Sequence, residues 1–202
     1  MILMSARLFF ALLTLTAIGT QLVVHVHLGF SLVNFFSYFT NLSNLFAAVV
    51  LLGGALSLLR HREPTQAWEI IRGTSVVCMA LVGVVFGLLL SNEDLGSLLP
   101  WVNIVLHYLM PVVMVLDWLV QPPQTKLVPK QIGFWLIFPL LYVLYSLIRG
   151  SRIGWYAYPF FDPTKVGGYG GVALYCVGIL LAFLILSWLL IAVGNRFQHK
   201  PA

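Results

Sequence analysis

Long apolar runs alternate with short polar connections along the whole chain. Six runs are each long enough, at about 1.5 Å of rise per helical residue, to cross roughly 30 Å of hydrocarbon. Their residues are continuously apolar rather than alternating, which excludes the strands of a membrane barrel. We therefore expect an all-α, single-domain bundle over residues 1–202, with six transmembrane helices near residues 8–28, 35–59, 74–90, 101–119, 132–148 and 172–193.

Composition supports the same class. Of the 202 residues, 60% are hydrophobic and 8% are charged, whereas an ordinary soluble domain carries about a quarter charged residues. A globule of this length has too little interior to hide so much apolar surface from water, so lipid is the expected solvent. The connections between the runs are too short to form a separate aqueous domain.

The net charge of +5 reflects topology rather than nucleic-acid binding. By the positive-inside rule, the side rich in Lys and Arg faces the cytoplasm. Both termini are therefore expected to be cytoplasmic in a multi-pass protein of the cell membrane, with membrane lipids as partners. The sequence indicates no soluble protein partner and leaves the oligomeric state open. Eight of the eleven basic residues lie on this side: Arg7, Arg60, Arg62, Arg72, Lys126, Lys130, Arg196 and Lys200.

Polar side chains within the second run form the first candidate site. Polar groups are costly in lipid, so they usually face a neighbouring helix or a cavity. Here they recur every three or four residues, which predicts that they share one helical face. Ser, Thr and Asn commonly join helices by hydrogen bonds, and lining of a pocket is the alternative function. The residues are Asn34, Ser37, Thr40, Asn41 and Asn44.

His107 in the fourth run is the second candidate, because an ionisable residue within a span often marks a functional site. Asn103 precedes it by one helical turn. Pro111 cannot donate to the carbonyl of His107, so a bend with a free acceptor is expected there. Counted along the helices, Thr40 lies about 8 Å and His107 about 9 Å below the same membrane face. Equal depth is necessary but not sufficient for a nucleophile and its base, because spans two and four must also be neighbours.

Other residues with chemical potential lie nearer the ends of the runs. Asp117 is expected to be an interfacial carboxylate rather than a proton relay. Tyr145 and Arg149 share a face of the fifth run, where Arg149 either reaches the headgroups or binds an anionic lipid group. Residues 155–163, rich in aromatics and proline, are expected to fold as a cap over the outer end. Two cysteines at different depths make neither a disulfide nor a zinc site, and we expect no metal or cofactor.

Together these features resemble a known family. Residues 36–44, His107 with Pro111, and residues 155–162 are similar to bacterial members of the androgen-induced membrane hydrolase superfamily. Its animal members are six-span proteins that hydrolyse fatty acid esters of hydroxy fatty acids with a threonine and a histidine inside the membrane. The resemblance implies that Thr40 is a nucleophile and that His107 is its base.

The sequence thus leaves two hypotheses. The first is a lipid ester hydrolase near the outer leaflet, in which Asn41 or Asn44 donates to the oxyanion. The second is a non-enzymatic lipid-binding or transport protein with a polar pocket between spans two and four. Candidate substrate contacts are Ser37, Asn41, Asn44, Asn103, Tyr145 and Arg149.

Overall fold

A computed structural model describes residues 1–197, so Lys200 lies outside the described part of the chain. Every regular element within those residues is helical. Short turns interrupt the longer helices near one end of the molecule. The elements are α1 (Ile2–His27), α2 (Leu32–Phe35), α3 (Phe39–Leu59), α4 (Gln66–Val85), η1 (Phe86–Leu90), α5 (Pro100–Ile104), η2 (Val105–Leu109), α6 (Met110–Val120), α7 (Gln131–Ile153), η3 (Pro159–Phe161) and α8 (Tyr169–Arg196).

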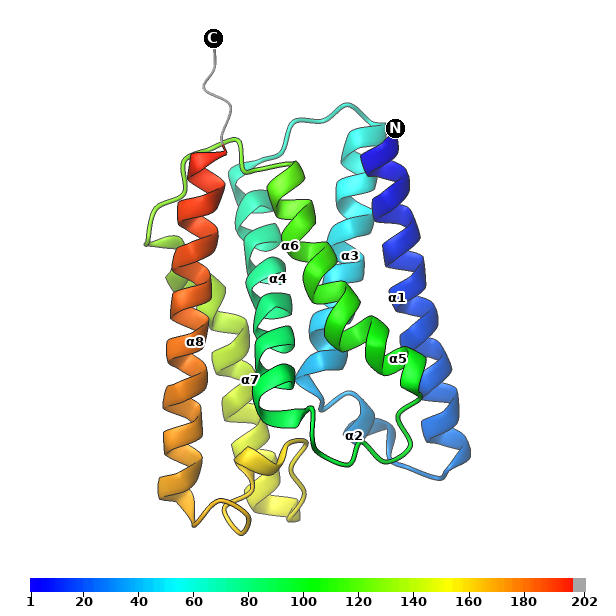
Figure 1. The fold of residues 1–202 in the computed structure, drawn as a ribbon, viewed down its shortest axis with the longest axis vertical. Coiled ribbons are helices and arrows are strands. Elements are labelled where there is room, and N and C mark those ends of the chain that lie inside the picture. Colours follow the sequence, from blue (N-terminus) through cyan, green and yellow to red (C-terminus); the bar gives the residue numbers. More distant parts are fainter. Residues whose placement is uncertain (198–202) are drawn as a thin grey trace.

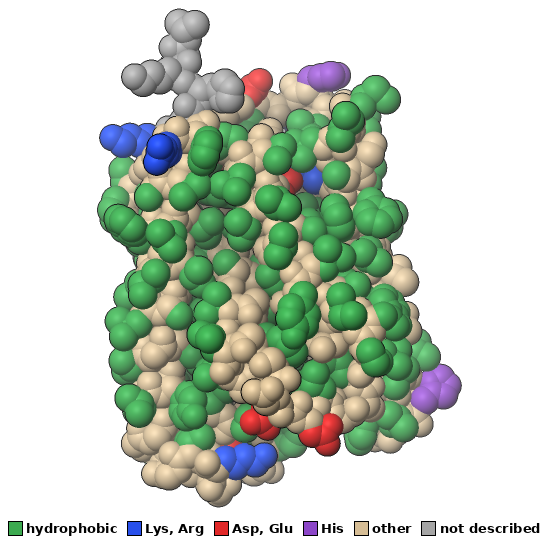
Figure 2. Space-filling model, viewed as in Figure 1, with side chains coloured by type: hydrophobic (Ala, Val, Ile, Leu, Met, Phe, Trp, Pro, Cys, Tyr) green, Lys and Arg blue, Asp and Glu red, His purple; other side chains and the backbone are tan. Residues whose placement is uncertain are grey.

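Six of the helical segments are long and apolar enough to cross a membrane, which confirms the predicted class. They run between the two ends of one bundle (Figure 1). Hydrophobic side chains cover the middle of the face in Figure 2, and charged side chains gather at its two ends. The spans are Ile2–His27, Phe39–Leu59, Gln66–Leu90, Pro100–Val120, Gln131–Ile153 and Tyr169–Arg196.

Helix α4 forms the centre of the bundle. It packs against α3, α6, α7 and α8, while α1 lies along α3. Its residues Val76, Val77 and Cys78 are fully buried. Met1 and the last turn of α8 lie at the same end of the bundle, which we call the terminal end (Figure 1). The opposite end carries the connection between α7 and α8, residues 154–168, which we call the cap.

The third span begins eight residues earlier than predicted, because its first charged side chains are paired inside the bundle. Arg72 Nη2 lies 3.0 Å from Asp117 Oδ2, and Arg7 Nε lies 2.6 Å from Asp117 Oδ1. Glu69 Oε2 lies 3.7 Å from Arg72 Nη1. All four side chains are buried. The expectation that Asp117 is an interfacial carboxylate is therefore wrong: it pairs with two arginines that the sequence indicated only as topology signals.

The second span begins later than predicted, because the chain breaks between α2 and α3. The Ser37 hydroxyl donates to the carbonyl of Val33 at 2.6 Å, and Tyr38 is extended, with φ −84° and ψ 126°. Ser and Asn side chains compete in this way with regular helical bonds. The prediction that the polar residues share one face of a continuous helix is therefore wrong: Asn34 and Ser37 precede the helix that carries Thr40.

Candidate functional site

A cavity of about 480 Å³ lies at the cap end between α1, α3, the two π turns and the cap. Thr40 and His107 both line it, as does Asn41. Exposed Glu93 and Lys165 lie at its edge. Spans two and four are therefore neighbours at the level of the candidate residues.

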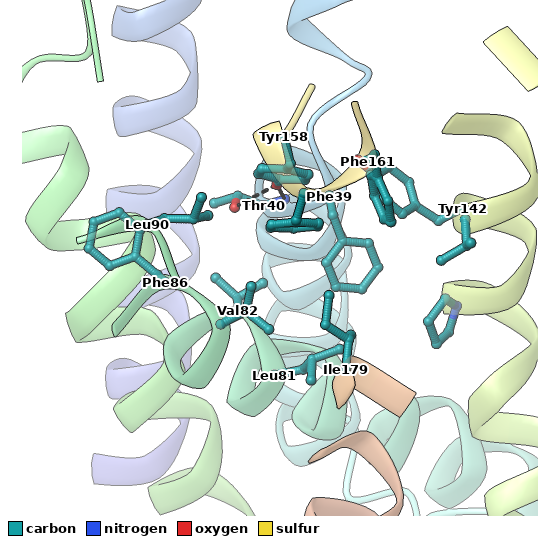
Figure 3. A pocket seen from close by; sticks show the side chains of 14 residues that line it. Phe39, Thr40, Leu81, Val82, Phe86, Leu90, Tyr142, Tyr158, Phe161 and Ile179 are labelled. Carbon is teal, nitrogen blue, oxygen red and sulfur yellow. Dashed lines mark hydrogen bonds between the residues drawn. The ribbon is translucent and has the colours of Figure 1, made fainter. Parts of the chain in front are cut away.

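Thr40 is the second residue of α3, directly after the chain break. The helix has no backbone acceptor for its first N–H groups. Tyr158 of the cap fills this role, because Thr40 N donates to Tyr158 Oη at 3.1 Å. The same Oη lies 3.2 Å from Thr40 Oγ1 (Figure 3). The Thr40 hydroxyl thus contacts Tyr158, and no hydrogen bond within residues 1–197 joins it to His107.

The protonation of the His107 ring follows from its partner. Nδ1 lies 2.7 Å from Asn103 Oδ1, and a carboxamide oxygen can only accept a hydrogen bond. The proton therefore resides on Nδ1, and Nε2 keeps its lone pair. The ring stacks on Phe86 with centroids 4.0 Å apart and planes 21° from parallel. In the part of the chain that the structure describes, Nε2 has no hydrogen-bond partner, so it is available as a base.

His107 lies within a π turn, η2, four residues before Pro111. Met110 N donates to Val105 O in the five-residue register of such a turn. In that register Pro111 would bond the carbonyl of Leu106, but proline has no N–H. The Asn44 side chain supplies the missing donor, since its Nδ2 donates to Leu106 O at 3.2 Å. The same Nδ2 also donates to Thr40 O at 2.9 Å. One amide thus links the backbone at Thr40 to the backbone beside His107.

A second, apolar cavity of about 50 Å³ adjoins the first, and we call it the slot. Figure 3 shows Val82, Leu81 and Ile179 on the side away from Tyr158. Residues of α3, α4, η1, α7, α8 and the cap line the slot. Thr40 therefore stands at a junction, with a polar cavity on one side and an apolar slot on the other. The residues that line both spaces are Thr40, Phe86, Leu90 and Tyr158.

Of the six predicted substrate contacts, Asn41 lines the larger cavity and the other five lie outside its lining. Three of those five, Ser37, Tyr145 and Arg149, make bonds that hold the cavity wall in place. The Ser37 hydroxyl bonds Tyr145 Oη at 2.7 Å. Arg149 Nη2 donates to Asn34 Oδ1 at 2.6 Å, and its guanidinium lies 5.0 Å from the centroid of the Trp155 ring. Asn34 and Trp155 themselves line the cavity. These bonds join α7 to the segment before α3.

The sequence did not single out two residues of this site, Tyr158 and Phe86. The aromatic stretch of the cap was expected to cover the bundle, and Tyr158, Phe160 and Phe161 are indeed buried. The density of aromatics in a connection was the available signal. Helical periodicity relates residues within one helix, so it could not connect a loop tyrosine to Thr40.

Within residues 1–197, no three His, Cys, Asp or Glu side chains are grouped so that they could hold one metal ion. No protein-family model, curated protein or solved structure matches this chain. The family resemblance remains a hypothesis.

Proposed function

We propose that the protein is an intramembrane hydrolase of lipid acyl esters, with Thr40 as nucleophile and His107 as base. One observation carries the proposal: the Thr40 hydroxyl lies where an apolar slot meets a polar cavity that also holds the imidazole. An acyl ester has the same division, with a hydrocarbon chain on one side of its carbonyl and a more polar alcohol on the other. The chain would enter the slot and the alcohol the larger cavity.

The chemistry follows the pattern of covalent catalysis. His107 Nε2 takes the Thr40 proton as Oγ1 bonds to the ester carbon. Collapse of the tetrahedral intermediate breaks the bond to the alkoxide, which receives that proton from the imidazole. Water, deprotonated by the same nitrogen, then bonds to the acyl carbon. The bond from that carbon to Thr40 Oγ1 breaks, the acid leaves, and Oγ1 takes the proton back from the imidazole. Because Thr40 Oγ1 contacts Tyr158, it has to turn toward Nε2 when the ester binds, and catalytic bonds often form only in that complex.

The half-buried carboxamide of Asn103 supports the assignment of the base. A neutral histidine with its proton fixed on one nitrogen presents the other as an acceptor, as catalytic histidines do. By the positive-inside rule, we also propose that the cap end faces outward, so that esters reach the site from the outer leaflet.

Hydrolysis of fluorogenic acyl esters by the detergent-purified protein tests the proposal. Thr40→Ala and His107→Ala should each lower kcat at least about 10³-fold, since each removes a group that the chemistry requires. Thr74→Ala is the matched control, because Thr74 is a buried threonine whose hydroxyl bonds only its own helix, at Ile70 O. A fluorophosphonate probe should label Thr40 in the native protein. Hydrolysis or labelling that persists in Thr40→Ala would refute the nucleophile.

A binding or transport function is the alternative, and the break between α2 and α3 favours it. Discontinuous helices commonly form the substrate sites of carriers. This alternative requires that Thr40→Ala and His107→Ala leave ester turnover intact while they change the uptake of a solute into vesicles.

A further inference from the structure

Tyr158 is held firmly in place by the aromatic side chains around it. Its ring stacks on Phe160, with centroids 5.1 Å apart and planes 10° from parallel, and meets the edge of Tyr38 at 5.7 Å. Only 8% of the residue is exposed. A buried ring packed among several aromatic side chains loses little further freedom when its hydroxyl makes a specific bond. In Figure 3 the side chain extends from the cap toward Thr40.

The hydroxyl of Tyr158 has its own proton available. Thr40 N–H can only donate, so Tyr158 Oη accepts that bond at 3.1 Å and keeps its O–H for a second partner. Thr40 Oγ1, at 3.2 Å, is within reach of that proton. Burial raises the pKa of Tyr158 to about 12, so the phenol stays protonated at neutral pH. The bond accepted from Thr40 N–H polarises the phenol and strengthens it as a donor.

The asparagines that the sequence suggested as oxyanion donors have other partners. Asn44 Nδ2 has two hydrogens and donates to two carbonyls, those of Thr40 and Leu106. Asn41 Nδ2 donates to Phe35 O at 2.8 Å, which directs its amide toward α2. Tyr158 is the side chain whose donor contacts Thr40 Oγ1 itself.

We infer that Tyr158 is a third catalytic residue, which donates a hydrogen bond to the oxyanion formed when Thr40 attacks an ester; the inference rests on the proposed function. In the tetrahedral intermediate the oxyanion and Thr40 Oγ1 are bonded to the same carbon. The Tyr158 hydroxyl, which contacts Oγ1, is therefore within reach of the oxyanion after a small rotation about the Cζ–Oη bond of Tyr158. The phenol keeps its proton throughout: the bond strengthens as negative charge develops on the carbonyl oxygen and weakens again when the alkoxide leaves.

Tyr158→Phe tests the inference, since it removes the hydroxyl and retains the ring. We expect kcat for acyl ester hydrolysis to fall about 10²- to 10³-fold, the usual effect of losing one oxyanion donor. KM should change less than about threefold, because the donor acts mainly on the transition state. Tyr175→Phe is the matched control, because Tyr175 stacks on the same Phe160 at 6.0 Å and is 38% exposed. Its kcat should equal that of the native protein.

A second variant separates catalysis from packing. Difluorotyrosine at position 158 keeps the shape and the donor, and its phenol ionises at lower pH than that of tyrosine. Its kcat should match the native value at acidic pH and fall on the alkaline side, where the native profile stays flat. Such a limb reports ionisation of the donor, which a purely structural residue would not produce.

The outcomes are distinct. If Tyr158→Phe retains kcat within about threefold while Thr40→Ala is inactive, the inference fails and the proposed function stands. The inference also fails if two results are found together. The first is that Tyr158→Phe lowers both kcat and the melting temperature, and the second is that kcat of the difluorotyrosine protein shows no fall on the alkaline side. Hydrolysis that survives in Thr40→Ala removes the proposed function itself.

Discussion

The Asn103 side chain decides which nitrogen of His107 carries the proton. A histidine inside a membrane span can serve as a packed hydrogen-bonding group or as a base, and its sequence position does not distinguish these functions. The 2.7 Å bond to the Asn103 oxygen fixes the proton on Nδ1. At the residue scale, this one bond makes the opposite nitrogen an acceptor.

Removing that bond should impair catalysis without removing the base. We predict that Asn103→Leu lowers kcat about 10- to 100-fold, less than His107→Ala does, because the imidazole remains but its tautomer and orientation are no longer fixed. Asn103→Asp keeps an acceptor oxygen and should retain more activity than Asn103→Leu. Equal hydrolysis rates for the two variants would show that the Asn103 oxygen has no influence on His107.

At the scale of the elements, helix α3 and the π turn η2 are held together by the Asn44 amide. Pro111 leaves the Leu106 carbonyl without its helical donor, and Asn44 supplies one from the neighbouring span. A buried carbonyl without a partner costs about 1–3 kcal/mol. The π register and Pro111 together leave one carbonyl without a helical donor, a tertiary contact supplies that donor, and the same turn carries His107.

Asn44→Leu should weaken both the fold and the site. We predict a loss of about 1–3 kcal/mol in stability, since the Leu106 carbonyl loses its donor and the Thr40 carbonyl loses a second hydrogen bond, together with a clear fall in kcat as η2 shifts relative to α3. Asn195→Leu is the matched control, because Asn195 bonds both the N and the O of Leu127, at 2.8 Å each, near the terminal end. The melting temperature in detergent should fall for both variants, whereas kcat for ester hydrolysis should fall for Asn44→Leu alone. If the two variants lose equal activity, the link is merely structural.

At the scale of the whole molecule, the two ends of the bundle are built differently. The terminal half contains buried ion pairs, in which Asp117 of α6 joins Arg7 of α1 and Arg72 of α4. Arg72 also lies over the Trp118 ring, 5.0 Å from its centroid. The cap half contains the cavity and the slot. A helix arrangement fixed at one end can thus support a hollow site at the other.

Loss of the central carboxylate should destabilise the whole bundle. We predict that Asp117→Ala costs about 3–5 kcal/mol, because two buried guanidinium groups lose their shared counter-charge. Glu93→Ala, which removes an exposed carboxylate at the cap end, should change stability by less than about 0.5 kcal/mol. Thermal unfolding in one detergent provides the comparison. A melting temperature of Asp117→Ala equal to that of Glu93→Ala would show that the ion pairs do not stabilise the fold.

The orientation in the membrane is a separate prediction at this scale. In a background of Cys78→Ala and Cys176→Ala, single cysteines can be placed at either end of the bundle. Asp94→Cys should react with a membrane-impermeant maleimide on intact cells, and Arg62→Cys should react only after lysis, because the positive-inside rule places the terminal end in the cytoplasm. The opposite labelling pattern would reverse the orientation and move the site to the cytoplasmic side.

Much of the architecture could be predicted from the sequence, because a membrane span requires only a run of successive apolar residues, which is a local feature of the chain. Lipid demands about 20 successive apolar residues for each span, and this length is visible in the chain itself. The starts of the second and third spans were wrong because they depend on distant partners. Glu69 and Arg72 belong to a span because Arg72 pairs with Glu69 and with Asp117 inside the bundle. At the break before Phe39, Ser37 and Asn41 bond backbone carbonyls of the preceding segment.

The sequence by itself determined six helices and identified Thr40 and His107 as polar residues in apolar surroundings, because the cost of a polar group in lipid depends on the residue and its immediate neighbours. Only the tertiary structure decided what those residues contact. Thr40 meets Tyr158 from a loop more than a hundred residues away, and His107 is carried by a turn that Asn44 completes from another helix. Hydrogen bonds act over about 3 Å, so partners distant in the chain are defined only once the bundle has folded.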